Sequence, residues 1–380
     1  MIEWSEEGVV HHALWRSESA AVAPRHLQPA DDTLSADIAY RLACEGTALL
    51  WRGDFQNARQ LLLALMRRAD RKHPKAAARA AQKLANASAA ERFHLHRQAQ
   101  AQRARTLGAL LIPIEGDYSI DLRRAPDLRA ACAEAWGPAD GQASVVALRE
   151  LLGIVGAHEW RKKGVDVPAL GARIHPHYGV FSPIRGEYID LVAQAPLPAG
   201  GELAFDIGTG TGVLAAVLAR RGVARIVATE LAPRALACAA DNLARLGLQQ
   251  RVELLAADLF PSGRAPLVVC NPPWVPARPS SAIEQAVYDE GSRMLRGFLA
   301  GLREHLAPGG EGWLILSDLA EHLGLRTRDE LLGWIAAAGL QVIGRLDARP
   351  RHGKAQDAGD PLHAARAAEV TSLWRLAAAA

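Results

Sequence analysis

Short apolar runs recur through the second half of the chain, separated by stretches long enough for a helix. The strands that these runs predict are Leu203–Asp206, Ile226–Thr229, Val252–Leu255, Leu267–Cys270, Trp313–Leu316, Gln341–Leu346 and Glu369–Leu376. Strands separated by connections of this length pair in parallel through right-handed crossovers. We therefore expect residues 169–380 to form a doubly wound α/β domain with a mostly parallel, seven-stranded sheet.

Apolar residues in the first half recur at helical spacing instead. They are Ile38, Leu42, Leu49, Leu50, Leu61, Leu62, Leu65 and Met66. This spacing is typical of one face of a helix. Gly53 separates two such helices, and Asp54 is placed to cap the second by accepting a hydrogen bond from a free amide. We expect residues 1–168 to form a mainly helical domain that recognises the substrate.

The end of this first half has a mixed pattern. Leu110–Ile114 and Tyr118–Leu122 predict two strands around a Glu-Gly-Asp turn, and helices are expected near 127–136 and 144–155. With 49% hydrophobic and 22% charged residues in 380, the composition is that of a globular protein. The formal net charge of +3 says nothing about partners, so any basic surface must be local.

One local basic segment is present. Between Met66 and Gly108 the chain has eleven Lys or Arg residues against two acids. The cations are Arg67, Arg68, Arg71, Lys72, Lys75, Arg79, Lys83, Arg92, Arg97, Arg103 and Arg105. Either this is a solvated helix face, or it contacts a phosphate backbone or an acidic protein surface. Phe93 is the one aromatic residue in the segment, which argues against stacking on single-stranded nucleic acid there.

The four cysteines, Cys44, Cys132, Cys238 and Cys270, are far apart, without the close pairs of a zinc site. The N-terminus is acidic where a secretory signal would be basic and then apolar, and no apolar run is long enough for a membrane span. We expect a cytoplasmic protein with no membrane contact and no metal.

A glycine-rich turn follows the first predicted strand of the second half. Gly208, Gly210 and Gly212, with Thr209 among them, let the backbone turn tightly and leave no side chain between chain and ligand. Such a turn also begins NAD(P)-binding folds, so an oxidoreductase is an alternative. Asp206 favours another ligand, because a carboxylate beside the turn repels a pyrophosphate and attracts an ammonium group.

The run from Asp206 to Gly212 resembles the first motif of class I S-adenosylmethionine-dependent methyltransferases. The resemblance implies S-adenosyl-L-methionine as cofactor, with Asp206 at its methionine end. It also implies that Glu230, after the second strand, binds the ribose hydroxyls and that Asp258, after the third, binds the adenine amino group. Leu231 or Leu259 would pack on adenine.

Four residues follow the fourth predicted strand: Asn271, Pro272, Pro273 and Trp274. The lone pair of an amide or exocyclic amine is delocalised, so such a nitrogen is a poor nucleophile while it stays planar. The Asn271 side-chain oxygen and the Pro272 carbonyl can each accept one N–H and direct the lone pair at a methyl donor. Both prolines have a fixed φ, which holds these acceptors in place. Trp274 can stack on a flat substrate.

This tetrapeptide resembles the fourth motif of adenine-N6 and glutamine-N5 methyltransferases, most of which have Tyr or Phe where this chain has Trp274. The preceding segment resembles the part of these enzymes that crosses the cofactor, so Phe181, Ser182 and Pro183 are candidates for lining the methyl donor. For His175 and His177, a hydrogen-bonded or surface role is favoured over metal binding. A candidate substrate lip follows the tetrapeptide, at Tyr288, Asp289, Glu290 and Arg293.

The methyl acceptor is the least determined part. A glutamine of a ribosomal protein or release factor, or a base of RNA or DNA, is favoured, with the basic segment supporting ribosome-associated RNA or protein, and a small metabolite remains the alternative. We expect an N-methyltransferase that acts on a macromolecule.

Overall fold

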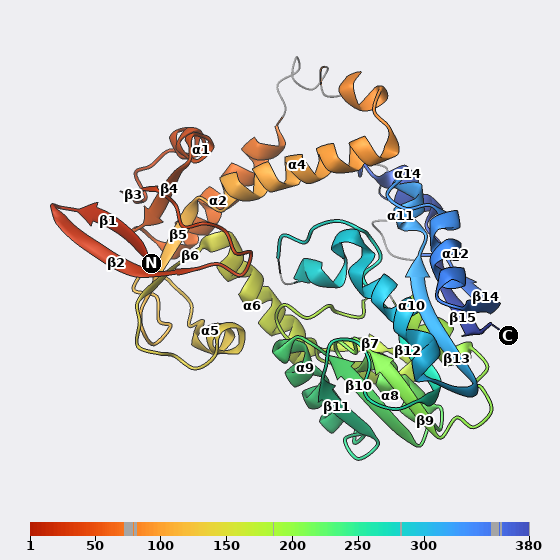
Figure 1. Ribbon diagram of the computed structural model, residues 1–380. Coiled ribbons are helices and arrows are strands. Elements are labelled where there is room, and N and C mark those ends of the chain that lie inside the picture. Colours follow the sequence, from red (N-terminus) through yellow and green to blue (C-terminus); the bar gives the residue numbers. More distant parts are fainter. Residues whose placement is uncertain are drawn as a thin grey trace. The chain divides into compact units, whose positions relative to one another are not determined.

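The computed structural model describes residues 1–71, 79, 82–184, 186–281, 283–350, 357 and 359–379. The chain divides into two compact units, Met1–Glu159 and Trp160–Ala380, which Figure 1 colours along the sequence. The boundary falls within helix α6 (Leu148–Lys163), nine residues before the expected boundary at 168. Each unit has its own sheet and its own apolar core.

The N-terminal unit is built on a six-stranded mixed sheet with the order β1-β2-β6-β5-β4-β3. Its strands are β1 (Ile2–Glu6), β2 (Val9–Arg16), β3 (His26–Ala30), β4 (Thr47–Trp51), β5 (Leu110–Ile114) and β6 (Ser144–Ala147). Its helices are α1 (Ala36–Glu45), α2 (Phe55–Asp70), α4 (Ala89–Leu107), α5 (Arg129–Trp136) and α6. The prediction of a mainly helical domain therefore missed the sheet, of which it included β5 alone.

Strand β4 shows why the helical assignment of Leu49 and Leu50 was wrong. Leu49 and Trp51 point into the core beneath α2, whereas Leu50 points to the opposite face and packs with Ile2 and Val145. All five of these residues, from the two cores on opposite faces of the sheet, are buried. A run buried on both faces of a sheet has no alternation, so it resembles a buried helix in sequence.

Two local predictions in this unit have different outcomes. Asp54 caps α2 as expected, because its side chain accepts hydrogen bonds from the Gln56 and Asn57 amides. Tyr118–Leu122 does not form a strand. Tyr118 instead has a left-handed φ of 68° and its amide donates to the Glu115 carbonyl, which closes a turn.

The C-terminal unit contains the predicted doubly wound sheet, with the order β11-β10-β9-β12-β13-β15-β14. Its strands are β9 (Leu203–Ile207), β10 (Arg225–Glu230), β11 (Val252–Ala256), β12 (Ala265–Cys270), β13 (Leu306–Ser317), β14 (Leu340–Ala348) and β15 (Thr371–Ala378). The first five pair in parallel, and β15 pairs antiparallel with both β13 and β14. The predicted mostly parallel, seven-stranded sheet is confirmed.

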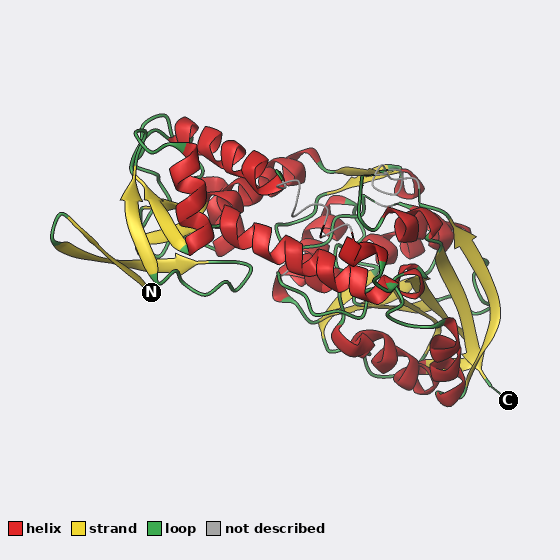
Figure 2. Ribbon diagram, turned by 90° about the horizontal axis from the view of Figure 1, so that it is seen from above, coloured by secondary structure: helices red, strands yellow, loops and turns green. Residues whose placement is uncertain are grey.

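Helices cover both faces of this sheet (Figure 2). They are α7 (Glu187–Gln194), α8 (Val213–Arg220), α9 (Pro233–Arg245), α10 (Arg293–His305), α11 (Leu319–His322), α12 (Arg328–Ala337) and α14 (His363–Ala368). The short elements β7 (Val165–Val167), η1 (Pro168–Leu170) and β8 (Ala172–Ile174) precede them, and η2 (Ile283–Ala286) and η3 (Glu290–Ser292) precede α10. The helices bury the sheet on both sides, as parallel strands require.

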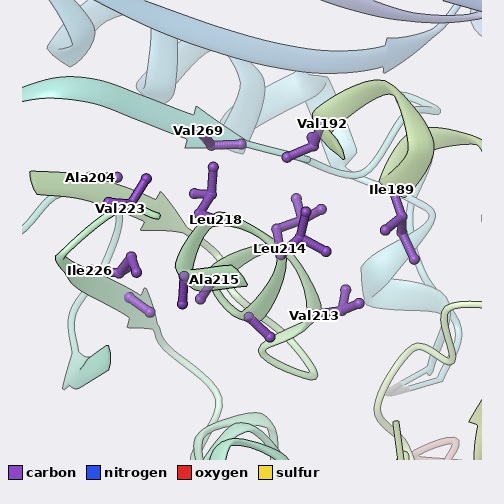
Figure 3. Close-up of a cluster of buried hydrophobic side chains, with 14 of the residues drawn as sticks. Ile189, Val192, Ala204, Val213, Leu214, Ala215, Leu218, Val223, Ile226 and Val269 are labelled. Carbon is purple, nitrogen blue, oxygen red and sulfur yellow. The ribbon is translucent and has the colours of Figure 1, made fainter. Parts of the chain in front are cut away.

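Successive residues of strands β9 and β12 point to opposite faces of the sheet. Ala204 and Val269 belong to the core that α7 and α8 cover, which Figure 3 shows, whereas Phe205 and Val268 belong to the core under α10 and α12. Both β9 and β12 are thus held rigidly between two layers, and the residues that follow their carboxyl ends start from fixed positions. No helix among the described residues is long and apolar enough to cross a membrane.

Candidate functional site

The glycine turn connects β9 to α8 at the carboxyl edge of the sheet. Gly208, Gly210 and Gly212 all have left-handed φ angles, of 71°, 56° and 80°. Residues with a Cβ are strained in this conformation, so the three glycines are needed for the backbone path. A Cβ on Gly208 would also collide with the Met294 methyl group, whereas one on Gly210 would enter open space. The turn is therefore open on the side where a ligand would approach Gly210.

Asp206 lies at the base of this turn and is 1% exposed. Its Oδ2 accepts a hydrogen bond from the Thr209 hydroxyl at 2.6 Å and another from the Ala215 amide at 3.1 Å. Burial raises the pKa of Asp206 to about 6, and the negative charge of Glu230 adds to the rise. Both of these hydrogen bonds fall on one oxygen, which leaves Oδ1 for a cationic or N–H donor.

Glu230, the last residue of β10, is connected to the same turn. Its Oε2 accepts from the Gly210 amide at 3.1 Å, and its Oε1 accepts from the Leu231 amide at 2.8 Å. The side chain of Leu231 is 59% exposed. The structure thus brings Glu230 and the glycine turn together, and the ribose-binding role of Glu230 stays a prediction.

Asp258 follows β11 and is exposed, with its carboxylate paired to the Arg293 guanidinium at 3.2 Å. Next to it, Leu259 has a left-handed φ of 73°. Its carbonyl accepts a hydrogen bond from the Thr229 hydroxyl at 2.5 Å. This contact ties the loop after β11 to the end of β10, the strand that carries Glu230.

The tetrapeptide from Asn271 to Trp274 starts directly after β12. Cys270 pairs with Ile207 of β9, so Asn271 and Gly208 leave adjacent strands at the same edge. Pro272 is buried, and Asn271, Pro273 and Trp274 are half-buried. The Trp274 indole Nε1 donates a hydrogen bond to Asn271 Oδ1 at 2.9 Å.

The segment after the tetrapeptide folds back beside it. Val275 forms an isolated bridge with Tyr288, and the Asp289 amide donates to the Val275 carbonyl at 3.0 Å. Asp289 also accepts from the Met294 amide at 2.8 Å at the start of α10, and burial raises its pKa. Tyr288 and Asp289 of the expected lip are therefore next to the tetrapeptide, whereas Arg293 is paired with Asp258.

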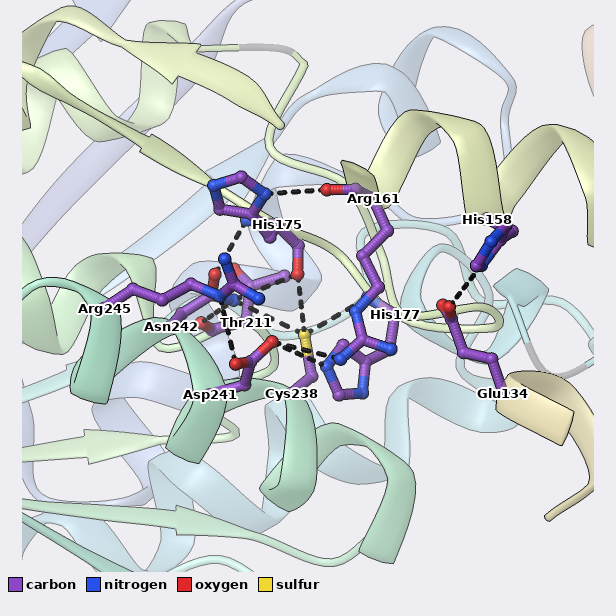
Figure 4. A network of polar contacts seen from close by, with 10 residues as sticks. All are labelled: Glu134, His158, Arg161, His175, His177, Thr211, Cys238, Asp241, Asn242 and Arg245. Carbon is purple, nitrogen blue, oxygen red and sulfur yellow. Dashed lines mark hydrogen bonds and ion pairs between the residues drawn. The ribbon is translucent and has the colours of Figure 1, made fainter. Parts of the chain in front are cut away.

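A polar network anchors the segment before α7 to α9 (Figure 4). The His177 ring contacts Asp241 Oδ2 at 3.3 Å, and Asp241 also binds Arg161 at 3.1 Å and Arg245 at 3.0 Å. His175 Nδ1 contacts the Arg161 carbonyl at 2.7 Å. Both histidines are thus engaged in hydrogen bonds, and no group of metal-binding side chains is found among the described residues.

Downstream of this network are Phe181, Ser182 and Pro183. Phe181 and Ser182 are half-buried and Pro183 is buried. The preceding Val180 packs with Ala235 and Cys238 of α9. The place of Phe181, Ser182 and Pro183 beside the methyl donor stays a prediction.

Sequence reasoning missed two residues that touch the site. Asn242 on α9 is 1% exposed and donates to the Thr211 carbonyl of the glycine turn at 3.1 Å. Arg326, before α12, is 3% exposed, and its Nη1 lies 3.5 Å from the Trp274 carbonyl. Both are far in sequence from the segments they contact, and no local pattern pointed to them.

The site lies in a part of the chain that is similar to a known protein family. The family model for the methyltransferase small domain matches residues 172–327, which include the glycine turn and the tetrapeptide. The similarity of this chain to the methyltransferase small domain covers these residues. The matched range contains strands β9 to β13 and Asn271, whereas β14 and β15 follow it.

Three curated relatives are similar to part of this chain. The release factor glutamine methyltransferase of Cereibacter sphaeroides is 35% identical over 164 residues, 39% of this chain and 56% of the relative. The ribosomal protein uL3 glutamine methyltransferase of Bordetella pertussis is 36% identical over 141 residues, 35% of this chain and 47% of the relative. The ribosomal protein L11 methyltransferase of Pelotomaculum thermopropionicum is 42% identical over 73 residues, 19% of this chain and 24% of the relative.

The chain spans about half the length of the release factor and uL3 methyltransferases it matches, 56% and 47%. The family match begins at residue 172, so the N-terminal unit lies outside it.

Proposed function

We propose that this chain is an S-adenosyl-L-methionine-dependent N-methyltransferase that methylates the side-chain amide of a glutamine in a ribosome-associated protein. One observation carries the proposal. The Asn-Pro-Pro-Trp segment leaves β12 beside the glycine turn that leaves β9, so acceptor groups for an N–H and the proposed cofactor turn share one edge of the sheet. Ligands of open α/β sheets bind at this edge.

The residues at this edge fit the cofactor. Asp206 is a buried carboxylate with a raised pKa, and the ammonium group of the methyl donor would supply the opposite charge that burial demands. Glu230 Oε2 accepts from the Gly210 amide of the turn and keeps a lone pair for a ribose hydroxyl, whereas Oε1 accepts from the Leu231 and Ala232 amides. Gly210 leaves open space for the ligand. Asp258, Leu231, Leu259, Phe181 and Pro183 complete the proposed cofactor site.

The chain's own groups prepare the acceptor nitrogen. When bound, the cofactor supplies an electrophilic methyl group. Asn271 Oδ1 and the Pro272 carbonyl would each accept one N–H of the target amide and point its lone pair at that methyl. No strong general base is required, because the N–H proton becomes acidic once the methyl is attached. Catalysis is then mainly alignment of donor and acceptor.

The substrate class rests on the relatives and on the basic segment. Two of the three relatives are named glutamine methyltransferases, and the names of all three specify a release factor or a ribosomal protein. The N-terminal unit, with its basic helices α2 and α4, would recognise such a substrate. Lys72 and Lys75 of the basic segment lie outside the described residues. The proposal includes a cytoplasmic location, and the four free cysteines are compatible with a reducing compartment.

The direct test is transfer of radioactive methyl groups from labelled S-adenosyl-L-methionine. The purified chain is incubated separately with a recombinant release factor, ribosomal proteins uL3 and L11, ribosomal RNA, and a cell extract. Label in a glutamine of a protein supports the proposal. Label in RNA assigns the RNA-base alternative, and label only in small molecules of a cell extract assigns a metabolite.

Asn271→Ala is the matched control for this assay. Losing a preorganised polar contact is expected to lower turnover by about 100-fold or more and to leave cofactor binding nearly unchanged. Equal turnover in Asn271→Ala would remove this side chain from the mechanism. Tight binding of NAD with no binding of S-adenosyl-L-methionine would overturn the cofactor assignment.

A further inference from the structure

Trp274 is tied into the protein on several sides. Its indole Nε1 donates to Asn271 Oδ1 at 2.9 Å, and its ring packs against the cores on both faces of the sheet. Arg326 Nη1 lies 3.5 Å from its carbonyl. A ring held this way leaves less of its face for a substrate than a free aromatic side chain would. Stacking alone therefore does not explain the hydrogen bond that the indole N–H makes.

The carboxamide of Asn271 has two ends that differ only in being O or NH₂. Rotation by half a turn exchanges an acceptor for a donor, and only the oxygen can accept an N–H from a target amide. An NH₂ group facing the indole N–H would put two donors against each other. The hydrogen bond from Trp274 therefore selects one orientation of the Asn271 amide.

The same hydrogen bond does not block the oxygen. An amide oxygen has two lone pairs, and the indole N–H uses one of them. The second remains for the N–H of a substrate. Phenylalanine at this position would offer no N–H at all, and a tyrosine hydroxyl would project from a different point of the ring.

We propose that Trp274 is a positioning residue, whose indole N–H holds the Asn271 carboxamide with its oxygen ready to accept the target N–H. The proposal rests on the N-methyltransferase function proposed above and adds a specific role for the residue in which this chain departs from Tyr or Phe. A stacking role would depend on the area of the ring, whereas this role depends on one hydrogen atom and one acceptor.

A double-mutant cycle separates the two roles. Turnover is measured with labelled S-adenosyl-L-methionine and a recombinant release factor. Because both terminal atoms of an aspartate are oxygens, orientation is irrelevant in Asn271→Asp. We expect Trp274→Phe to lower kcat about 10-fold with Asn271 present and less than about 3-fold in the Asn271→Asp background, a coupling typical of residues in direct contact.

The controls make the cycle decisive. KM for the release factor should change little in Trp274→Phe, because the substrate contact itself is kept. Equal losses in both backgrounds, or a loss confined to KM, would show a stacking or purely structural role and overturn the proposal. Trp160, which is 53% exposed, offers the matched control, and Trp160→Phe should leave kcat and KM unchanged.

A second measurement requires no substrate. The nine tryptophans are labelled with ¹⁵N in the indole, and the Trp274 signal is the one absent from Trp274→Phe. Its N–H should exchange slowly with solvent in the wild type and in Asn271→Asp, and about 10-fold faster or more in Asn271→Ala, where the acceptor is gone. An unchanged exchange rate of the Trp274 indole N–H in Asn271→Ala would contradict the proposal. This result decides the case even if no protein is methylated or Asn271→Asp is inactive.

Discussion

Asn242 joins two segments that are far apart in sequence: its Nδ2 donates to the Thr211 carbonyl at 3.1 Å, while its Oδ1 accepts from the His175 amide at 2.7 Å. Thr211 belongs to the glycine turn and His175 to the segment before α7. One buried side chain on α9 thus holds both against the same helix. The shape of the turn depends on this carboxamide as well as on its glycines.

Asn242→Ala should destabilise the C-terminal unit. It leaves the His175 amide and the Thr211 carbonyl without this partner in a buried site, which costs about 1–3 kcal/mol for each such group. Urea unfolding measures the loss. Asn86→Ala, at an exposed asparagine, serves as the control and should change stability by less than about 0.5 kcal/mol. Equal stability of the two variants would mean that the turn holds its shape without Asn242.

Cofactor binding should depend on pH through Asp206. Its pKa of about 6 means that the carboxylate is mostly protonated at pH 5 and mostly ionised at pH 7. The ammonium group of S-adenosyl-L-methionine needs the ionised form, so affinity should rise with pH through about 6 and level off above about pH 7. Calorimetric titration between pH 5 and 8 tests this. Asp206→Asn should bind weakly with no such rise, and an equal rise in this variant would assign the titration to another group.

The same pKa has a consequence for stability of the protein without cofactor. The unfolded carboxyl has a pKa near 3.8 and the folded one a pKa of about 6, so the folded state binds more protons between these values. Stability should therefore fall as pH rises from about 4 to 6, by on the order of 3 kcal/mol at most from this group. Urea unfolding of the wild type and Asp206→Asn should converge at low pH and separate above pH 6.

The sequence predicted the C-terminal sheet well because the evidence for it is local. Each strand is a short apolar run followed by a turn or helix, and Asp206, Glu230 and Asn271 each come at or near a strand end, where the edge of the sheet gathers them. The insertion of β15 between β13 and β14 follows from pairing between distant segments, which no local pattern contains.

The N-terminal sheet escaped prediction for a related reason. Leu49 and Leu50 of β4 are buried on opposite faces, so their spacing fits a helix as well as a strand. The contacts of Arg326 and Asn242 with the site could not be predicted from local patterns either, because each contact joins residues more than thirty positions apart in sequence. Strand-end residues were predictable, and the side chains that support them from elsewhere were not.

Arg326 should weaken the protein's stability. It is 3% exposed, burial lowers its pKa, and among the described residues its Nε and Nη2 have no hydrogen-bond partner. A buried charge without full pairing is costly, so Arg326→Met should raise the free energy of unfolding by about 1 kcal/mol or more and unfold at a higher temperature. Calorimetry measures this.

Arg328 provides the matched comparison two residues away. Its Nε contacts Glu321 at 2.9 Å, so Arg328→Met should lower the melting temperature or leave it unchanged, and should not raise it. A lower melting temperature in Arg326→Met would instead indicate that its long contact with the Trp274 carbonyl outweighs the burial of its charge.

The basic helices predict that substrate binding depends on salt if the substrate is presented on a ribosomal particle. Arg67 and Arg71, at the end of α2 and directly after it, are exposed, whereas Arg68 is bound to Asp37 at 2.8 Å. Reversing the two exposed charges, in R67E/R71E, should weaken binding to purified ribosomal subunits about 10-fold or more at low salt. It should also reduce the slope of log affinity against log salt by about two.

Arg264 is the control for this charge reversal, because it is exposed and precedes β12, at the end of that strand opposite to Asn271. R264E should leave both affinity and salt slope nearly unchanged, which separates a local basic surface from the effect of net charge. Affinity for ribosomal subunits is measured by sedimentation at several salt concentrations. Binding that is insensitive to salt, or equally weakened in R264E, would exclude α2 as a phosphate-contacting surface and favour a substrate free of RNA.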